Sequence, residues 1–280
     1  MPYVSTNGIR LAYQRAGRGE PVLMIMGQAA GGNVWSMYQV PALASAGYEV
    51  IAFDNRGVPP SDVPPGDYSL ADLAADTVGL IEALDAGPCL LVGTSLGAMI
   101  ATEVAVCRPD LVRCCVLMAM RARPDAVRRA VSAGERVLAL AGVQLPAAYE
   151  AMVGVLQMFS PATLNDEAAV SGWLDIFEMA APRRAAAGGQ SAVDVTSDRR
   201  DALRAVPVPC RVIAFSDDLM CPPYLSAEVA EAIPDCDYLE IGSCGHLGYL
   251  ERPAEVNSAI IEFLDKNRMD SAPGAVHLMS

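Results

Sequence analysis

The chain has 280 residues, of which 52% are apolar, and it carries a formal net charge of −13. This length allows one large α/β domain with an insertion or two small domains, and the excess of acidic groups disfavours binding to nucleic acid or to an anionic membrane. No apolar run reaches the roughly 18 residues that cross a bilayer, and the N-terminus lacks a basic start followed by an apolar block, so we expect a cytoplasmic protein without a signal peptide.

The first part of the chain alternates between strand-like and helix-like segments. Short apolar runs bounded by turn residues predict strands at residues 9–16, 21–27, 48–54, 89–93 and 113–120. Helices are expected between them, at residues 35–44, 70–84 and 96–107. The second of these helices is amphipathic, and Ser69 precedes it as a typical N-cap residue.

The alternation stops after residue 120 and resumes near residue 207. Residues 121–206 contain ten Arg and ten acidic residues and are rich in Ala and Met, so we expect a neutral helical insertion there. Beyond it, strands are predicted at residues 210–218 and 236–242, and helices at residues 226–233 and 252–267. The predicted organisation is therefore an α/β core formed by residues 1–120 and 207–267, a helical cap at 121–206 and a flexible tail at 268–280.

Alternating strands and helices imply crossover connections and a mainly parallel sheet. An insertion between two strands is well placed to lie over the carboxyl edge of such a sheet, where open α/β sheets bind their ligands. The sequence therefore predicts one α/β domain with a cap over its candidate site.

A serine between two glycines marks the junction of a predicted strand with a predicted helix. Residues 89–105 read CLLVGTSLGAMIATEVA, in which Gly93, Ser95 and Gly97 form the pattern G-x-S-x-G. The pattern alone is weak, but a strand before it and a helix after it are the setting of a nucleophile elbow. The alternative is an ordinary Gly-Ser turn.

A serine nucleophile needs a base, and the base needs a carboxylate partner. Of the two histidines, His277 lies in the predicted tail, whereas His246 directly follows the last predicted strand. Asp217 and Asp218 follow the preceding strand, and Asp125 is a more distant candidate. The eight cysteines lack zinc-site spacing, so we expect reduced, buried cysteines and no metal.

With these residues in the order Ser, Asp, His, the chain resembles the α/β-hydrolase fold superfamily over nearly its whole ordered length. Four further segments carry the resemblance: MGQAAGGNVW, FDNRGVPPSD, FSDDLMCPP and GHLGYLERP. The third places Asp218 four residues before Pro222, which favours Asp218 over Asp217 as the acid.

This resemblance implies a mostly parallel eight-stranded sheet flanked by helices, with residues 121–206 as the helical cap. The oxyanion donors would be the backbone N–H groups of Gln28 and Leu96, and Gln28 would also place a polar side chain beside them. The cap supplies candidate pocket residues, although packing between cap and core is the simpler explanation of such apolar side chains: Met152, Met158, Phe159, Trp173, Phe177 and Met179. Arg121 and Arg123, which begin the cap, would either meet a substrate carboxylate or be solvated.

The expected activity is hydrolysis of an ester, thioester or lactone of an apolar small molecule, without a cofactor, by a monomer or homodimer. One alternative is a lyase, eliminase or cyclase of natural-product biosynthesis, or a cofactor-free perhydrolase, on the same fold. A second alternative is a non-catalytic ligand-binding protein.

Overall fold

The computed structural model describes residues 1–182 and 187–268. Its centre is an eight-stranded sheet in the order β1-β2-β4-β3-β5-β6-β7-β8. In this sheet β2 pairs antiparallel with both of its neighbours, β1 and β4, and strands β3 to β8 pair in parallel. The strands are β1 (Tyr3–Thr6), β2 (Ile9–Gly17), β3 (Glu20–Ile25), β4 (Tyr48–Phe53), β5 (Cys89–Thr94), β6 (Val112–Met118), β7 (Cys210–Phe215) and β8 (Cys236–Ile241). The predicted mostly parallel sheet is confirmed.

One strand was not expected from the sequence. β1 forms a hairpin with β2 through Asn7 and Gly8, which both have positive φ, at 48° and 76°. Two central residues with positive φ are typical of the two-residue hairpin turn for which Asn-Gly is the preferred pair. The Asn-Gly pair is therefore the sequence signal for this hairpin.

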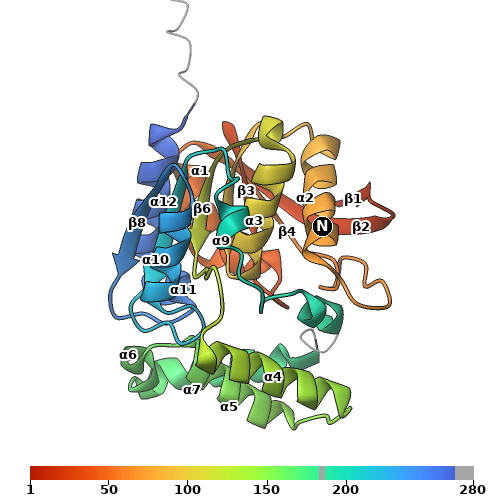
Figure 1. Ribbon diagram of the computed structural model, residues 1–280, viewed down its shortest axis with the longest axis vertical. Helices are drawn as coiled ribbons and strands as arrows, with labels where there is room; N and C mark the ends of the chain where they lie inside the picture. Colours follow the sequence, from red (N-terminus) through yellow and green to blue (C-terminus); the bar gives the residue numbers. More distant parts are fainter. Residues whose placement is uncertain (183–186, 269–280) are drawn as a thin grey trace, which may run out of the picture.

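Helices cover both faces of the sheet, because alternate side chains of its central strands point to opposite sides and both sets are apolar. On one face lie α2 (Leu70–Ala83), α3 (Leu96–Cys107) and α10 (Pro223–Ala232); on the other lie α1 (Gln39–Ser45) and α12 (Pro253–Lys266) (Figure 1). Leu23 of β3 packs in the first apolar cluster and Met24 in the second, and both side chains are buried. The sheet is thus the middle of three layers.

The helix expected at residues 35–44 is divided into two pieces. A 3₁₀ segment, η1 (Gly32–Met37), precedes α1, and Tyr38 between them has the non-helical angles φ −142° and ψ −43°. Pro41 has no N–H to donate to Met37, so an α-helix that contains it can begin only shortly before it. In α2, by contrast, the predicted N-cap is confirmed, because Ser69 and Asp72 form a reciprocal capping box.

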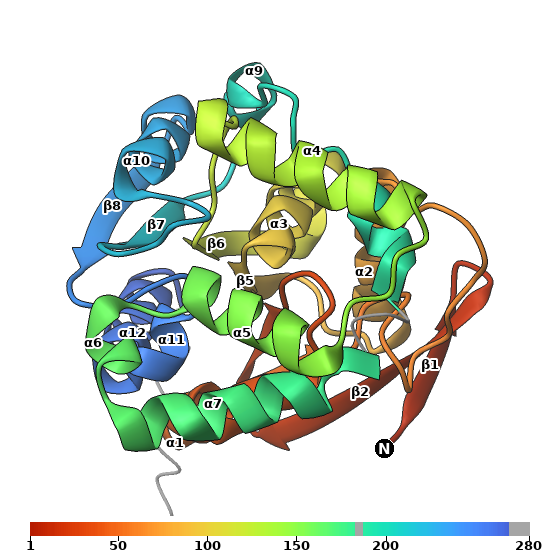
Figure 2. The ribbon, with the colours of Figure 1, turned by 90° about the horizontal axis from the view of Figure 1, so that it is seen from below.

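The segment between β6 and β7 is helical over its described residues. Its helices are α4 (Ala126–Leu140), α5 (Ala147–Met158), α6 (Pro161–Leu164), α7 (Glu167–Met179) and α9 (Arg200–Leu203), with the 3₁₀ turn η3 (Ala187–Ala192). Figure 2 shows α4, α5 and α7 across the end of the sheet domain, with α3 visible between α4 and α5. α9 instead packs beside α10 of the core.

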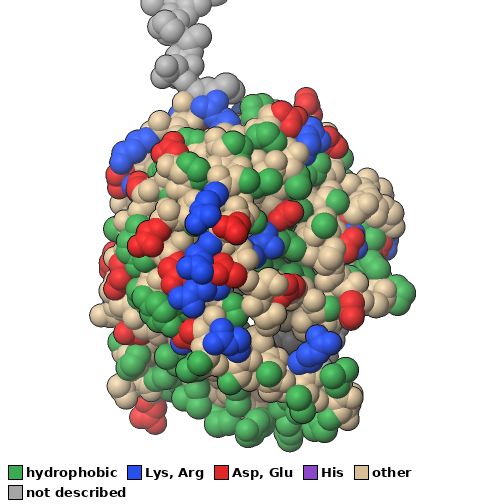
Figure 3. Space-filling view, viewed as in Figure 1, with side chains coloured by type: hydrophobic (Ala, Val, Ile, Leu, Met, Phe, Trp, Pro, Cys, Tyr) green, Lys and Arg blue, Asp and Glu red, His purple; other side chains and the backbone are tan. Residues whose placement is uncertain are grey.

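The outer side of the cap exposes apolar side chains. Figure 3 shows hydrophobic groups along its lower edge, over α4 and α5. Val137 and Leu140 of α4 and Leu156 of α5 are exposed. Across residues 1–182 and 187–268, no helix combines the length and the apolar character needed to cross a membrane. Apart from Arg268, the predicted tail at 268–280 lies outside the described residues.

Candidate active site

Ser95 stands at the turn where β5 ends and α3 begins. Its backbone angles are φ 53° and ψ −119°, a conformation that L-residues avoid, and its N–H donates a hydrogen bond to Met118 O at 2.9 Å. Such strain costs of order 1–3 kcal/mol and persists only where the surroundings impose it. The sharp turn places Ser95 at the N-terminus of α3, where the first N–H groups have no partner within the helix.

The two glycines of the motif are required by close backbone approaches. A Cβ at Gly93 would collide with the carbonyl oxygen of Gly97, and a Cβ at Gly97 would collide with the carbonyl oxygen of Ile25. Gly27 also lies close to the serine, since a Cβ there would lie 3.3 Å from Ser95 Cβ and 3.9 Å from its Oγ. The loop after β3 therefore passes directly beside the Ser95 hydroxyl.

His246 and Asp218 form a buried hydrogen-bonded pair. Nδ1 of His246 lies 3.0 and 2.9 Å from the two carboxylate oxygens of Asp218, and the residues are 6% and 2% exposed. Because an ionised carboxylate can only accept, Nδ1 carries the proton and Nε2 is left as an acceptor. The backbone N–H groups of Met220 and Cys221 also donate to Asp218 Oδ1, at 2.7 and 2.8 Å.

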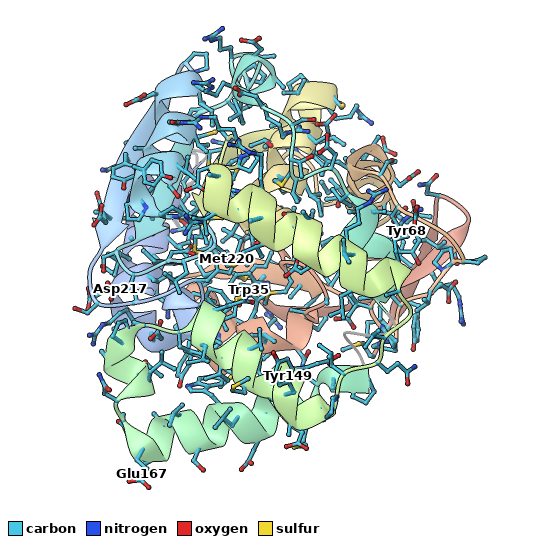
Figure 4. The ribbon with its side chains drawn as sticks, turned by 60° about the horizontal axis from the view of Figure 1, so that its bottom comes forward. Trp35, Tyr68, Tyr149, Glu167, Asp217 and Met220 are labelled. Atoms are coloured by element: carbon cyan, nitrogen blue, oxygen red, sulfur yellow. The ribbon has the colours of Figure 1, made fainter. Side chains whose placement is uncertain are left out.

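The other acid candidates make no hydrogen bond to His246 among the described residues. Asp217 is half-buried, its N–H donates to Cys244 O at 2.9 Å, and in Figure 4 it lies near the edge of the molecule while Met220 lies near the middle. Asp125 accepts hydrogen bonds from Tyr224 and Arg128. The structure therefore pairs His246 with Asp218, whereas His277 lies outside the described residues.

The serine, the histidine and the two predicted oxyanion donors share one cavity of about 850 Å³. Gln28, Ser95, Leu96 and His246 all line it, at the carboxyl ends of the strands. Such a volume lies within the range of small-molecule sites. Most of the remaining wall is apolar, with Met26, Met99, Met120, Leu138, Val153 and Leu247 among its residues.

The predicted pocket residues divide into two groups. Met158 and Phe177 line the cavity, whereas Met152, Phe159 and Trp173 are absent from its described lining. Phe159 is 2% exposed and packs on Trp173 with ring centroids 4.8 Å apart, so the two hold cap elements together. Met152 and Met179 are 38% and 81% exposed, respectively.

The two arginines at the start of the cap are bound to protein groups. Arg123 forms a two-point ion pair with Glu228, with Nε to Oε2 at 2.8 Å and Nη2 to Oε1 at 2.5 Å. Arg121 lines the cavity and donates from Nη1 to Met220 O at 2.9 Å. Arg121 thus holds the loop whose N–H groups bind Asp218, a role that the sequence analysis did not include.

Glu251 connects the loop after β8, which carries His246, to the cap. Its carboxylate accepts from the Gly245 N–H at 2.6 Å and from the hydroxyls of Ser160 at 2.6 Å and Thr163 at 2.5 Å. The first partner precedes His246, whereas Ser160 lies between α5 and α6 and Thr163 lies in α6. The glutamate of the GHLGYLERP segment is the sequence signal for this contact.

Three side chains at the site are of types that ligate metals. One ligand atom each from Asp218, Cys221 and His246 lies within 4.8 Å of the others. A cysteine ligand must be a thiolate, but burial raises the pKa of Cys221 to about 12. Because Asp218 and His246 Nδ1 already bond to each other, the arrangement fits a hydrogen-bonded catalytic pair better than a set of metal ligands.

Comparisons with known proteins give a consistent result. A family model described as "Alpha/beta hydrolase family" matches residues 27–259. The "Putative non-heme bromoperoxidase BpoC" of Mycobacterium tuberculosis is 43% identical over 257 residues, which are 91% of this chain and 97% of that protein. Its crystal structure matches with a TM-score of 0.88 at 41% identity, covering 92% of this chain and 97% of that one. A thermophilic esterase from Thermogutta terrifontis matches with a TM-score of 0.80 at 28% identity, covering 96% and 99%.

Proposed function

The chain belongs to the alpha/beta hydrolase family, and from this premise we propose that it hydrolyses an ester, thioester or lactone of a largely apolar small molecule. The observation that carries the proposal is the buried pair of His246 and Asp218, of which His246 lines one cavity together with the strained Ser95. A nucleophile, a base and an orienting acid are the three roles that acyl transfer requires.

The proposed reaction has two stages, in which Ser95 is first acylated by the substrate and the acyl-enzyme is then hydrolysed by water. His246 Nε2 takes the proton of Ser95 while the oxygen attacks the carbonyl carbon, and the proton then passes to the leaving alcohol or thiol. Water, deprotonated by the same nitrogen, cleaves the acyl-enzyme. The N–H groups of Gln28 and Leu96 stabilise the oxyanion in both stages, and each such donor is typically worth about 10²–10³ in rate.

The composition of the cavity supports an apolar substrate. Side chains from Met26, Met99, Met120 and Met158 face it, and methionine adapts to irregular apolar ligands. The name of the Thermogutta terrifontis relative, an esterase, supports an ester as the bond that is cleaved.

The test is covalent labelling of the serine. Intact mass measured after exposure to a fluorophosphonate should show one adduct on the wild type and none on Ser95→Ala. The Ser95→Cys variant is a second check, because it should lose the adduct while retaining the fold by circular dichroism. A folded wild type that forms no adduct would contradict the proposal.

A second candidate activity is favoured by the name of the M. tuberculosis relative, which is that of a bromoperoxidase. In this reaction hydrogen peroxide replaces water in the attack on the acyl-enzyme, which releases a peracid and restores Ser95. The peracid then oxidises bromide to hypobromous acid and becomes the carboxylic acid. Bromination of monochlorodimedone that requires acetate, bromide and peroxide, and that is absent in Ser95→Ala, would support this activity.

A further inference from the structure

The loop that carries the proposed oxyanion donor Gln28 forms a tight turn. The N–H of Ala30 donates to the carbonyl oxygen of Gly27 at 3.4 Å, and Ala29 has a φ of 59°. A bond from the fourth residue to the first, with positive φ at the third, is the pattern of a type II turn. The Gly27 carbonyl then points into the turn, so the Gln28 N–H on the same peptide unit points out of it.

This turn is not the one that its residues prefer. The third position of a type II turn normally holds Gly or Asn, because a Cβ disfavours positive φ. Here the position holds Ala29. The type I turn, which avoids the positive φ, differs mainly by a flip of the peptide unit between Gln28 and Ala29. Some other contact must therefore hold this peptide unit in place.

A side chain from the far end of the cap segment makes that contact. Oε1 of Gln190 accepts from the Ala29 N–H at 2.8 Å, and its Nε2 donates to Arg56 O at 2.8 Å. A carbonyl oxygen can only accept, so Arg56 fixes the Gln190 amide with nitrogen toward itself and oxygen toward Ala29. Flipping the peptide would direct the Gln28 carbonyl toward that oxygen, which is repulsive.

The glutamine is held firmly enough to impose this choice. Gln190 is 1% exposed and lies in η3, which packs on the loop around Tyr68. The Tyr68 N–H donates to Gly189 O at 3.0 Å. A Cβ at Gly189 would lie 2.6 Å from the Tyr68 ring and 2.7 Å from Gly66 O, so only glycine permits this approach.

We propose that Gln190 is a positioning residue that holds the oxyanion loop in its active conformation and so couples the cap segment to transition-state stabilisation. The inference rests on the proposed function. Gln190 does not touch the reacting atoms; through the Ala29 N–H it fixes the peptide unit that follows Gln28 and so the conformation of the loop that carries the donor. The loss expected without it is smaller than the 10²–10³ typical of deleting an oxyanion donor, because the Gln28 N–H remains and only the loop around it is held less firmly.

The experiment compares Gln190→Met with the wild type and with Gln39→Met. Gln39 is also buried, at 0% exposure, and donates to a backbone carbonyl, that of Tyr249, at 2.8 Å, but it has no bond to residues 27–30. The readouts are the rate of inactivation by a fluorophosphonate and kcat and KM for p-nitrophenyl butyrate, measured well below each melting temperature. Gln190→Asn, which keeps the amide but is too short for both bonds, replaces Gln190→Met if that variant does not fold.

We expect the Gln190 variant to lose about tenfold in kcat and in inactivation rate, with KM within twofold and the pH dependence of kcat/KM unshifted. Gln39→Met should keep both rates within twofold even if its melting temperature falls. Equal inactivation rates in the wild type and the Gln190 variant would overturn the role of Gln190 alone. Absence of any adduct in the wild type would overturn both this role and the proposed function.

Discussion

Arg128, on cap helix α4, donates hydrogen bonds from its guanidinium to the carbonyl oxygen of Leu219. Leu219 lies in the loop that follows β7 and carries Asp218, which we call the acid loop. The N–H on the other side of the same peptide unit, that of Met220, donates to Asp218 at 2.7 Å. The next peptide unit is arranged in the same way, with Arg121 on its carbonyl. Two consecutive peptide units thus link the cap arginines to the Asp218 carboxylate that holds His246. The conformation of the acid loop therefore depends on contacts with the cap.

Replacing Arg128 by methionine should therefore lower activity from a distance. Arg128 is outside the described lining of the cavity, so KM should change little. We expect kcat/KM to fall about fivefold to tenfold, which corresponds to about 1–1.4 kcal/mol of transition-state stabilisation. Steady-state kinetics on a chromogenic ester provide the measurement.

The adjacent arginine is the matched control. Arg129 also lies on α4, but its guanidinium donates to Pro124 O at 3.0 Å and makes no hydrogen bond to the acid loop among the residues that the structure describes. Arg129→Met should keep kcat/KM within twofold. If the Arg128 and Arg129 variants lost activity equally, the effect would arise from the charge of the helix and not from the contact with Leu219.

The two neighbouring aspartates should differ sharply in a comparison of amide variants. Asp218→Asn replaces the acceptor at His246 Nδ1 by a group that favours the wrong tautomer, and such a change costs about 10⁴ in kcat in a serine protease triad. Asp217→Asn alters a half-buried side chain without a bond to the histidine and should stay within threefold. Single-turnover acylation rates measure both variants. Comparable losses in the two would contradict the assignment of Asp218.

Gly97→Ala should destabilise the protein, because its Cβ would collide with the carbonyl oxygen of Ile25 in the neighbouring strand. The clash is with backbone, so we expect a loss of about 2–4 kcal/mol in the free energy of unfolding. Gly172→Ala is the control: it lies in α7 with open space around its Cβ position and should raise stability by about 0.5–1 kcal/mol. Urea denaturation of both variants is the measurement, and a Gly97→Ala variant as stable as the wild type would argue against the close approach.

Asp125 should give the junction of cap and core a pH-dependent stability. Burial alone would raise its pKa, but hydrogen bonds from the Arg128 backbone, the Tyr224 hydroxyl and the Arg128 side chain outweigh burial and hold the pKa well below its usual value. A carboxyl group with a lowered folded-state pKa contributes stability that is complete above its unfolded value of about 3.9 and is lost as the pH falls through the folded-state value.

Asp125→Asn should consequently be less stable than the wild type at pH 6, and the difference should shrink below about pH 4. Free energies of unfolding at pH 6, 5, 4 and 3 test this. A difference that stays constant across these pH values would show that the ionised carboxylate is not the stabilising group.

Much of the core could be read from the chain because each element has a local cause. Buried parallel strands are short continuous apolar runs, and the runs at residues 21–27, 48–54 and 113–120 contain or closely overlap β3, β4 and β6. The split of the helix expected at residues 35–44 was missed, because the missing N–H of Pro41 was not considered in that prediction. Hairpin strand β1 was missed because the Asn7-Gly8 pair was not used as a turn signal.

The sequence by itself determined the layered α/β architecture, the serine at a strand-to-helix turn, and the order of serine, acid and base, because these depend on local spacing and chain order. Only the tertiary structure decided which aspartate meets His246, which cap side chains face the cavity, and that Arg121, Arg128 and Gln190 hold loops far away in sequence. Those contacts depend on how the cap segment folds back over the strand ends, and no local pattern records that path. A buried glutamine that bonds two distant backbone groups leaves no periodicity or motif in the chain.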